Sequence, residues 1–192
     1  MENVRIIKNF LDAQAVAKFI EYTDLLEQRM PEEFSTYQDG KRLALQFGND
    51  LYHGHSSRLD LTLLGDMESD VREYFKLAIQ ATKDSFEVDP AAELFVCSFW
   101  IAKQYPGATV EEHEDTDDGH NPHFEYSAVL YLNTLDGSGD LEFTELGYKC
   151  SPAAGDLVIF PSKSTGMHRV SKILEDRYSM PLWLTFDRSF EL

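Results

Sequence analysis

The sequence predicts an α+β fold in which N-terminal helices buttress a C-terminal jelly roll. Two segments before residue 90 carry apolar side chains at helical spacing. After Pro90 the chain consists of short runs rich in Val, Ile, Phe, Tyr and Trp, interrupted by Gly, Pro, Asn and Asp. This order of helices before strands argues against a doubly wound parallel sheet. We therefore expect a single domain over residues 1–192, with helical support and loops in 1–90 and the jelly-roll core in 91–192.

Two helices are predicted in the first half of the chain. The first follows Asp12, whose side chain can cap the first turn, and runs through "AQAVAKFIEYTDLLEQ". The second covers "DMESDVREYFKLAIQATKDSF", residues 66–86. Its broad apolar stripe consists of Met67, Val71, Tyr74, Phe75, Leu77 and Ile79. Both helices have an apolar face that must pack against another layer of structure.

Loops and strands are predicted between and after these helices. The segment from Arg29 to about Leu59 combines Pro31 and several glycines with short apolar pieces such as "RLALQF". This pattern predicts loops with one or two short strands, forming either a lid or a surface excursion. The strands predicted after Pro90 are "ELFVCSFWIAKQY", "YSAVLYLN", "DLEFTEL", "DLVIFPS" and "RYSMPLWLTFD".

Composition limits the class of protein. A hydrophobic content of 43% is ample for a buried core in 192 residues. The formal net charge of −17 would repel a phosphate backbone, so nucleic acid is a poor default partner. The N-terminus lacks the apolar core of a signal peptide, and no run approaches the ~18 apolar residues of a membrane span. We expect a cytoplasmic protein with no membrane partner and with Cys97 and Cys150 as free thiols. The oligomeric state stays open.

The stretch "EEHEDTDDGH", residues 111–120, surrounds His113 with carboxylates. A solvated acidic loop is the ordinary interpretation of such a run. However, His113 and Asp115 are two residues apart, so in extended backbone their side chains point to the same face, while Glu114 points away. With a second imidazole from a distant strand, they would complete the 2-His-1-carboxylate arrangement of non-haem Fe(II) oxygenases. The flanking acids, Glu111, Glu112, Asp117 and Asp118, are expected to stay solvated.

Among the other histidines, His168 is the best candidate for the second imidazole. It follows the predicted strand "DLVIFPS" and lies at a strand edge. Nine residues later come Arg177 and then Ser179, which share a strand face and are suited to bind a carboxylate. His120 and His123 could replace His113 as ligands, but they are weaker candidates because they lie in the turn "GHNPHFEY". His53 and His55 are also weaker, because neither has a carboxylate within two residues. We place His120 and His123 near the metal or at the surface, and His53 and His55 in a loop.

The motifs also follow a recognisable order along the chain. They are "YPG" at Tyr105–Gly107, "HED" at His113–Asp115, "YLN" at Tyr131–Asn133, "GSGDLEF" at Gly137–Phe143, "PAAGDLVIFPS" at Pro152–Ser162, then His168 and Arg177. This ordered set resembles the iron- and 2-oxoglutarate-dependent dioxygenases, and within them the prolyl 4-hydroxylase-like group. The resemblance covers roughly residues 95–188, about half of the chain.

The resemblance implies a double-stranded β-helix core and specific roles for residues. It makes His113, Asp115 and His168 the catalytic iron ligands and Arg177 the partner of the distal carboxylate of 2-oxoglutarate. Three further residues are expected to contact this cosubstrate, namely Tyr131, Ser179 and Tyr105. The implied cofactors are Fe(II), 2-oxoglutarate and O2, with ascorbate as an optional addition.

The implied reaction is hydroxylation with release of succinate and CO2. The resemblance favours a prolyl residue in a polypeptide as the substrate, and a free amino acid or other small molecule is the alternative. Because Asp115 occupies the third ligand position and leaves no site for a halide, hydroxylation is expected rather than halogenation. The net charge favours neutral or basic peptides, which would enter between residues 116–125 and 29–59.

Some residues depart from the family pattern or have simpler interpretations. Phe124 and Ser127 stand where the family often has Arg and Thr. Val110 stands where the family often has a tyrosine. Of the usual pair of glycines in the turn, Ser138 replaces the first, and Gly139 is the second. Tyr131 could be an ordinary strand aromatic, and Arg177 could pair with Glu175 or Asp176 at the surface. A zinc hydrolase could use the same three ligands but would not need Arg177 and Ser179. A non-catalytic binding module also remains an alternative.

Overall fold

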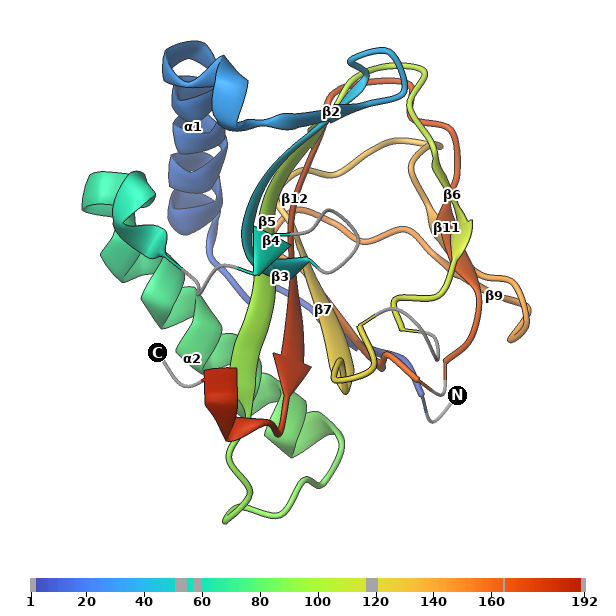
Figure 1. Cartoon of the computed structure of the whole chain (residues 1–192). Helices are drawn as coiled ribbons and strands as arrows, with labels where there is room; N and C mark the ends of the chain where they lie inside the picture. Colours follow the sequence, from blue (N-terminus) through green and yellow to red (C-terminus); the bar gives the residue numbers. More distant parts are fainter. Residues whose placement is uncertain (1–2, 51–54, 57–59, 117–120, 164, 191–192) are drawn as a thin grey trace.

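The computed structural model describes residues 3–50, 55–56, 60–116, 121–163 and 165–190, which form two facing β-sheets with helices on one side (Figure 1). The large sheet has eight strands: β1 (Arg5–Ile7), β2 (Ser35–Tyr37), β3 (Arg42–Asp50), β4 (His55–Ser56), β5 (Phe95–Gln104), β7 (Tyr126–Tyr131), β10 (Leu157–Pro161) and β12 (Arg177–Thr185). Their order is β1-β10-β7-β12-β5-β3-β2, and β4 pairs with β3. The small sheet is β6-β11-β8-β9, made of β6 (Val110–His113), β8 (Leu141–Phe143), β9 (Tyr148–Cys150) and β11 (His168–Val170). The predicted α+β jelly roll is confirmed.

Helices α1 (Ala13–Arg29) and α2 (Glu68–Ser85) cover the outer face of the large sheet, opposite the small sheet (Figure 1). The Asp12 side chain caps α1 as predicted, because it accepts a hydrogen bond of 2.8 Å from the backbone N–H of Ala15. A 3-10 helix, η3 (Leu61–Met67), leads into α2. Two short 3-10 helices, η1 (Pro31–Glu33) and η4 (Arg188–Phe190), complete the described elements.

The buried face of α2 is narrower than the sequence suggests. Tyr74 and Phe75 are buried as predicted, and the Tyr74 hydroxyl donates to the carbonyl of Met180 in β12 at 2.8 Å. Leu77, which we placed in the apolar stripe, is 41% exposed. The helix turns by ~100° per residue, so Leu77 lies off the side that packs on the sheet, and Ala78 takes the buried position instead.

The N-terminal half contributes strands to the large sheet as well as helices, including β3, which is longer than the short strands predicted within residues 29–59. β1 pairs with β10, and the nine-residue β3 pairs with β5 over Arg42–Gly48. Residues 42–48 are therefore part of the large sheet and not a lid or surface excursion. Gly48 allows this pairing, because a side chain there would collide with the backbone carbonyl of Cys97. Whether residues 51–54 and 57–59 form a lid lies outside the described residues.

Alternation along the central strands separates the two faces of the large sheet. On β3, Leu43, Leu45 and Phe47 point toward the helices and join the main hydrophobic core. Arg42, Ala44 and Gln46 occupy the alternate positions and point toward the small sheet. The space between the sheets is therefore lined by polar as well as apolar groups, and this interior holds the functional site.

Two further sequence predictions can be compared with the structure. Cys97 and Cys150 are both buried free thiols, as expected. Among the described residues, no helix is long and apolar enough to span a membrane.

Candidate functional site

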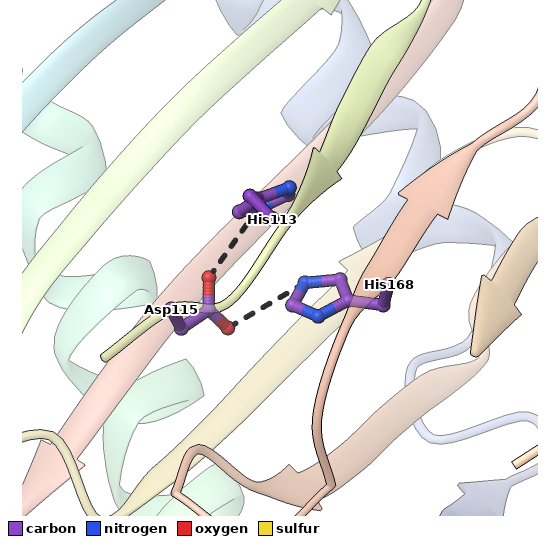
Figure 2. A group of neighbouring side chains, drawn as sticks. All are labelled: His113, Asp115 and His168. Atoms are coloured by element: carbon purple, nitrogen blue, oxygen red, sulfur yellow. Dashed lines mark ion pairs between the residues drawn. The ribbon is translucent and has the colours of Figure 1, made fainter. Parts of the chain in front are cut away.

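Three predicted ligands meet between the sheets. His113 ends β6 and His168 begins β11, and antiparallel pairing places the two residues directly opposite each other. Asp115 follows two residues after His113, so its carboxylate returns to the same side (Figure 2). One ligand atom from each of the three residues lies within 4.8 Å of the others. The Nε2 atoms of His113 and His168 are 3.6 Å and 3.8 Å from the Asp115 carboxylate oxygens.

The Nδ1 atoms of both histidines contact backbone carbonyls. Nδ1 of His113 is 2.8 Å from the carbonyl oxygen of Glu111, and Nδ1 of His168 is 3.4 Å from that of Gly166. Because a carbonyl can only accept, these contacts favour a proton on Nδ1. Each Nε2 then presents its lone pair toward Asp115, which is the orientation that a metal ligand needs.

Asp115 is fixed by buried serines on the large sheet. Ser127 of β7 donates from Oγ to Oδ2 of Asp115 at 2.5 Å, and the Oγ of Ser162 lies 2.7 Å from that of Ser127. Burial alone would raise the pKa of the Asp115 carboxyl, but His168, His113 and the Ser127 hydrogen bond outweigh it and lower the pKa. The carboxylate is thus held ionised and oriented.

The pKa values of the two imidazoles are shifted in opposite directions. At His168, burial lowers the pKa, and the nearby Asp115 carboxylate only partly offsets it. At His113, burial also acts to lower the pKa, but hydrogen bonding to and attraction by Asp115 outweigh it, so the pKa is raised.

A cavity of about 640 Å³ extends from the three ligands along the inner face of the large sheet. Arg177 and Ser179 of β12, Gln104 of β5 and Tyr131 of β7 line it. Strand register sets these positions, because Arg177 pairs with Gln104, and Ser179 pairs with Tyr131. A volume of this size falls within the range of small-molecule sites.

Arg177 is buried in this cavity and does not pair with Glu175 or Asp176. Its Nη1 donates to Gln104 Oε1 and, at 3.1 Å, to Ser179 Oγ, while its guanidinium carbon lies 4.9 Å from the centroid of the Tyr131 ring. Its Nε and the Tyr131 hydroxyl are buried without a hydrogen-bond partner among the described residues. Buried donors of this kind require an acceptor. Together they can bind a carboxylate.

Tyr105 does not join this cavity, contrary to expectation. Its hydroxyl donates to Glu27 of α1. The reason is alternation: Gln104 points inward, so the next residue points outward toward the helices. Lys103 has the same outward direction and forms ion pairs of 2.8 Å with Asp24 and Glu27. Tyr105 and Lys103 therefore attach α1 to the outer face of the large sheet.

The remaining candidate residues lie outside the three-residue cluster or outside the described residues. His123 stacks on Phe190 at 5.0 Å between ring centroids, and burial lowers its pKa. Glu111, Glu112 and Glu114 are exposed, as expected for solvated acids. His53, His120, Asp117 and Asp118 lie outside the described residues, as does the side chain of His55.

Several residues that line the cavity were not predicted from the sequence. Arg42 of β3 and Trp100 of β5 both do so, and neither was a candidate. The signal for Arg42 was present, because "RLALQF" alternates leucines and phenylalanine with Arg42, Ala44 and Gln46. Ser127 was noted only as a departure from the family pattern, yet it holds Asp115.

Residues 99–185 match the family model for the 2OG-Fe(II) oxygenase superfamily. This segment is a 2OG-Fe(II) oxygenase domain. The family implies Fe(II), 2-oxoglutarate and O2, and the His113, Asp115 and His168 cluster lies within the matched segment of the oxygenase domain. Comparison with curated proteins gives no match.

Solved structures share the fold of the oxygenase domain and its N-terminal support. A prolyl hydroxylase of Trichoplax adhaerens, in complex with a peptide fragment of the hypoxia inducible factor oxygen degradation domain, aligns with a TM-score of 0.70 at 16% identity, covering 99% of this chain and 86% of that chain. A Pseudomonas putida prolyl-4-hydroxylase gives 0.63 at 21% identity, covering 95% and 92%. An oxidoreductase of the 2OG-Fe(II) oxygenase family from Burkholderia pseudomallei gives 0.66 at 18% identity, covering 96% and 85%. The expected double-stranded β-helix is thereby confirmed.

Proposed function

We propose that this protein hydroxylates a prolyl residue in a polypeptide and converts 2-oxoglutarate to succinate and CO2. In this proposal His113, Asp115 and His168 hold Fe(II), and Arg177 holds the distal carboxylate of 2-oxoglutarate. The observation that carries the proposal is the shared cavity, which joins the three converging ligands to buried donors of Arg177 and Tyr131 that have no partner among the described residues.

The three side chains fit an iron site in number and in kind. Two imidazoles whose Nε2 atoms face one ionised carboxylate make a 2-His-1-carboxylate set, which leaves coordination positions open for other groups. Ser127 engages Oδ2 of Asp115 and so limits how this carboxylate can rotate. A carboxylate in the third ligand position also supports hydroxylation over halogenation.

The cavity wall fits the cosubstrate. Arg177 supplies a fixed positive charge, and Ser179 and Tyr131 supply hydroxyl groups beside it. Gln104 accepts a hydrogen bond from Nη1 of Arg177, and the Nε of Arg177 has no partner among the described residues. A metal hydrolase does not require this buried cluster of carboxylate-binding groups. The composition of the cavity wall therefore supports the oxygenase function over a hydrolase function.

When bound together, Fe(II), 2-oxoglutarate and O2 supply an oxidant that inserts one oxygen atom into a C–H bond of the substrate. The chain's own groups orient and enclose the reactants. His168 and Arg177 are buried and the Asp115 side chain is only 8% exposed, which limits bulk water around these groups and strengthens electrostatic interactions with the cosubstrate, while the His113 side chain is 41% exposed.

Proline as the target is supported by the fold and by the cavity wall. Trp183 and Phe124, which line the cavity and stack at 5.4 Å between ring centroids, offer an apolar surface that suits a pyrrolidine ring. Two of the structures that share this fold are described as prolyl hydroxylases.

The test is incubation of the protein with Fe(II), 2-oxoglutarate and a peptide panel in which each prolyl peptide is matched by its alanyl counterpart. We expect succinate release and a mass gain of about 16 Da on prolyl peptides only, the gain that one inserted oxygen atom gives. His168→Ala is the inactive control. Turnover without 2-oxoglutarate would indicate a hydrolase, and a preference for free L-proline would indicate a small-molecule hydroxylase.

A further inference from the structure

Arg42 is a second arginine in the cavity, and it forms no ion pair with the acidic residues that the structure describes. Register places it opposite Gln104, which in turn lies opposite Arg177, so the three residues form one row across β3, β5 and β12. Its Nε is buried and, within the described part of the chain, lacks a hydrogen-bond partner. Burial lowers the pKa of the Arg42 guanidinium. A buried donor of a charged guanidinium that has no acceptor is costly, so its presence in a cavity points to a ligand.

Aromatic rings hold the Arg42 guanidinium and leave its N–H edge available. Its guanidinium carbon lies 5.3 Å from the centroid of the Tyr37 ring and 5.8 Å from that of Trp100. Tyr37 is itself fixed, because Gln46 donates to its hydroxyl at 2.7 Å. Contacts over the ring faces do not use the N–H groups, which remain available to a hydrogen-bond acceptor.

Two indole N–H groups in the same cavity also lack partners. The Nε1 atoms of Trp100 and Trp183 are buried and unpartnered among the described residues, and the two rings meet edge to face at 5.1 Å between centroids. Indole N–H groups can only donate. With Arg42, they give this side of the cavity three buried donors.

We propose that Arg42 and Trp100, with Trp183 beside them, form a subsite that binds a carboxylate group of the substrate. This proposal rests on the proposed oxygenase function, in which Arg177 at the other end of the row is used by 2-oxoglutarate. A singly charged carboxylate fits better than a phosphate, because the subsite has one cation and Glu111 and Glu114 line the same cavity. The substrate class is therefore an amino acid, or a peptide that presents one carboxylate near the hydroxylated carbon.

A requirement for one carboxylate is compatible with the net charge of −17. Long-range repulsion acts on the total charge of a substrate and slows the association of acidic molecules. The subsite, in contrast, binds a single carboxylate group once the substrate has entered the cavity. A substrate that is neutral or basic overall can still place a single carboxylate at Arg42.

The test uses the protein loaded with Zn(II), which accepts the same ligands without redox chemistry, together with 2-oxoglutarate. Tryptophan fluorescence is the readout, because the chain has two tryptophans and both line this cavity. Two matched probe pairs identify the source of the carboxylate. N-acetyl-L-proline against N-acetyl-L-prolinamide tests a carboxylate on the target residue, and acetyl-Pro-Glu-amide against acetyl-Pro-Gln-amide tests an acidic neighbour.

In at least one pair, we expect the carboxylate probe to bind roughly 10- to 150-fold more tightly than its neutral partner, the factor given by hydrogen bonding to a charged group. Arg42→Gln should remove this preference without changing the affinity for 2-oxoglutarate, and Arg42→Lys should restore part of it. Arg72→Gln is the matched control, because Arg72 is exposed on α2 and pairs with Glu68.

Equal binding of both probes in each pair by the wild-type protein would overturn the proposal, even if the variants fail to fold. It is also overturned if the preference survives in Arg42→Gln, or if that variant loses 2-oxoglutarate binding instead. These outcomes differ from failure of the oxygenase function, which shows as no succinate from Fe(II), 2-oxoglutarate and prolyl peptides.

Discussion

Ser127 and Asp115 are joined by a hydrogen bond of 2.5 Å between Oγ and Oδ2, although 12 positions separate them in the sequence. Ser127 must donate in this bond, because an ionised carboxylate only accepts. Ser162, 2.7 Å away, therefore donates to Ser127. A directed chain of two buried hydroxyls thus ends on the carboxylate that we assign to the metal.

Removing the first hydroxyl of this chain should weaken metal binding. We expect Ser127→Ala to lower the affinity for Mn(II) or Fe(II) about 10- to 100-fold, as is usual when a partner that orients a ligand is lost. Ser127→Thr keeps the hydroxyl and should retain most of the affinity. Titration calorimetry measures the metal affinity of both variants. Ser162→Ala should lower this affinity less, because Ser162 acts on Asp115 only through Ser127. Unchanged metal affinity in Ser127→Ala would show that Asp115 does not depend on this bond.

Metal binding should raise the melting temperature of the native protein. At a metal concentration 100 times Kd the gain is about 2.7 kcal/mol, which corresponds to roughly 5–10 °C for a chain of this size. We expect His113→Ala, Asp115→Ala and His168→Ala to lose this shift, and chelation to reverse it in the wild type. His123→Ala, whose ring stacks on Phe190 outside the cluster, should keep it. If His123→Ala lost the shift, the ligand assignment would have to change.

Arg177 should govern 2-oxoglutarate binding far more than metal binding. We expect Arg177→Met to weaken 2-oxoglutarate affinity roughly 30- to several-thousand-fold, since losing one partner of a buried charge pair costs ~2–5 kcal/mol. Arg177→Lys should be milder but impaired, because an ammonium group lacks the planar fork. Arg169→Met, at an exposed arginine that pairs with Glu142, is the control. Equal 2-oxoglutarate dependence in Arg177→Met and wild type would exclude the assigned role.

Asp156 should stabilise the fold in a pH-dependent way. Burial acts to raise the pKa of its carboxyl, but hydrogen bonds from Lys8 and the backbone N–H groups of Ala153 and Asn9 outweigh this and lower it. A lowered folded-state pKa gives stability that is present above the unfolded pKa of about 3.9 and is lost as pH falls through the folded value. We expect Asp156→Asn to cost about 1.5–3 kcal/mol near pH 7.

Thermal unfolding of wild type and Asp156→Asn from neutral to acid pH measures this effect. The difference in melting temperature should be several degrees at pH 7, at about 2–4 °C per kcal/mol, and should shrink below about pH 4. A difference that stays constant over the whole pH range would show that the carboxylate charge contributes nothing.

The sequence by itself determined the features that depend on near neighbours in the chain. Asp12 as the cap of α1 follows from local hydrogen bonding. The common face of His113 and Asp115 follows from the two-residue period of extended backbone. The order of motifs was enough to indicate the 2OG-Fe(II) oxygenase family, because each motif is a short contiguous segment.

Only the tertiary structure decided which faces and strands come together. His168 meets His113 because β11 pairs with β6, a contact between segments that are 55 positions apart. Tyr105 was misplaced because Gln104 and Lys103 are both polar, so local polarity does not distinguish the inward face of β5 from the outward face. Arg42 enters the cavity through pairing of β3 with β5. Alternation divides a strand into two faces locally, but long-range packing of the helices and of the second sheet determines what each face meets.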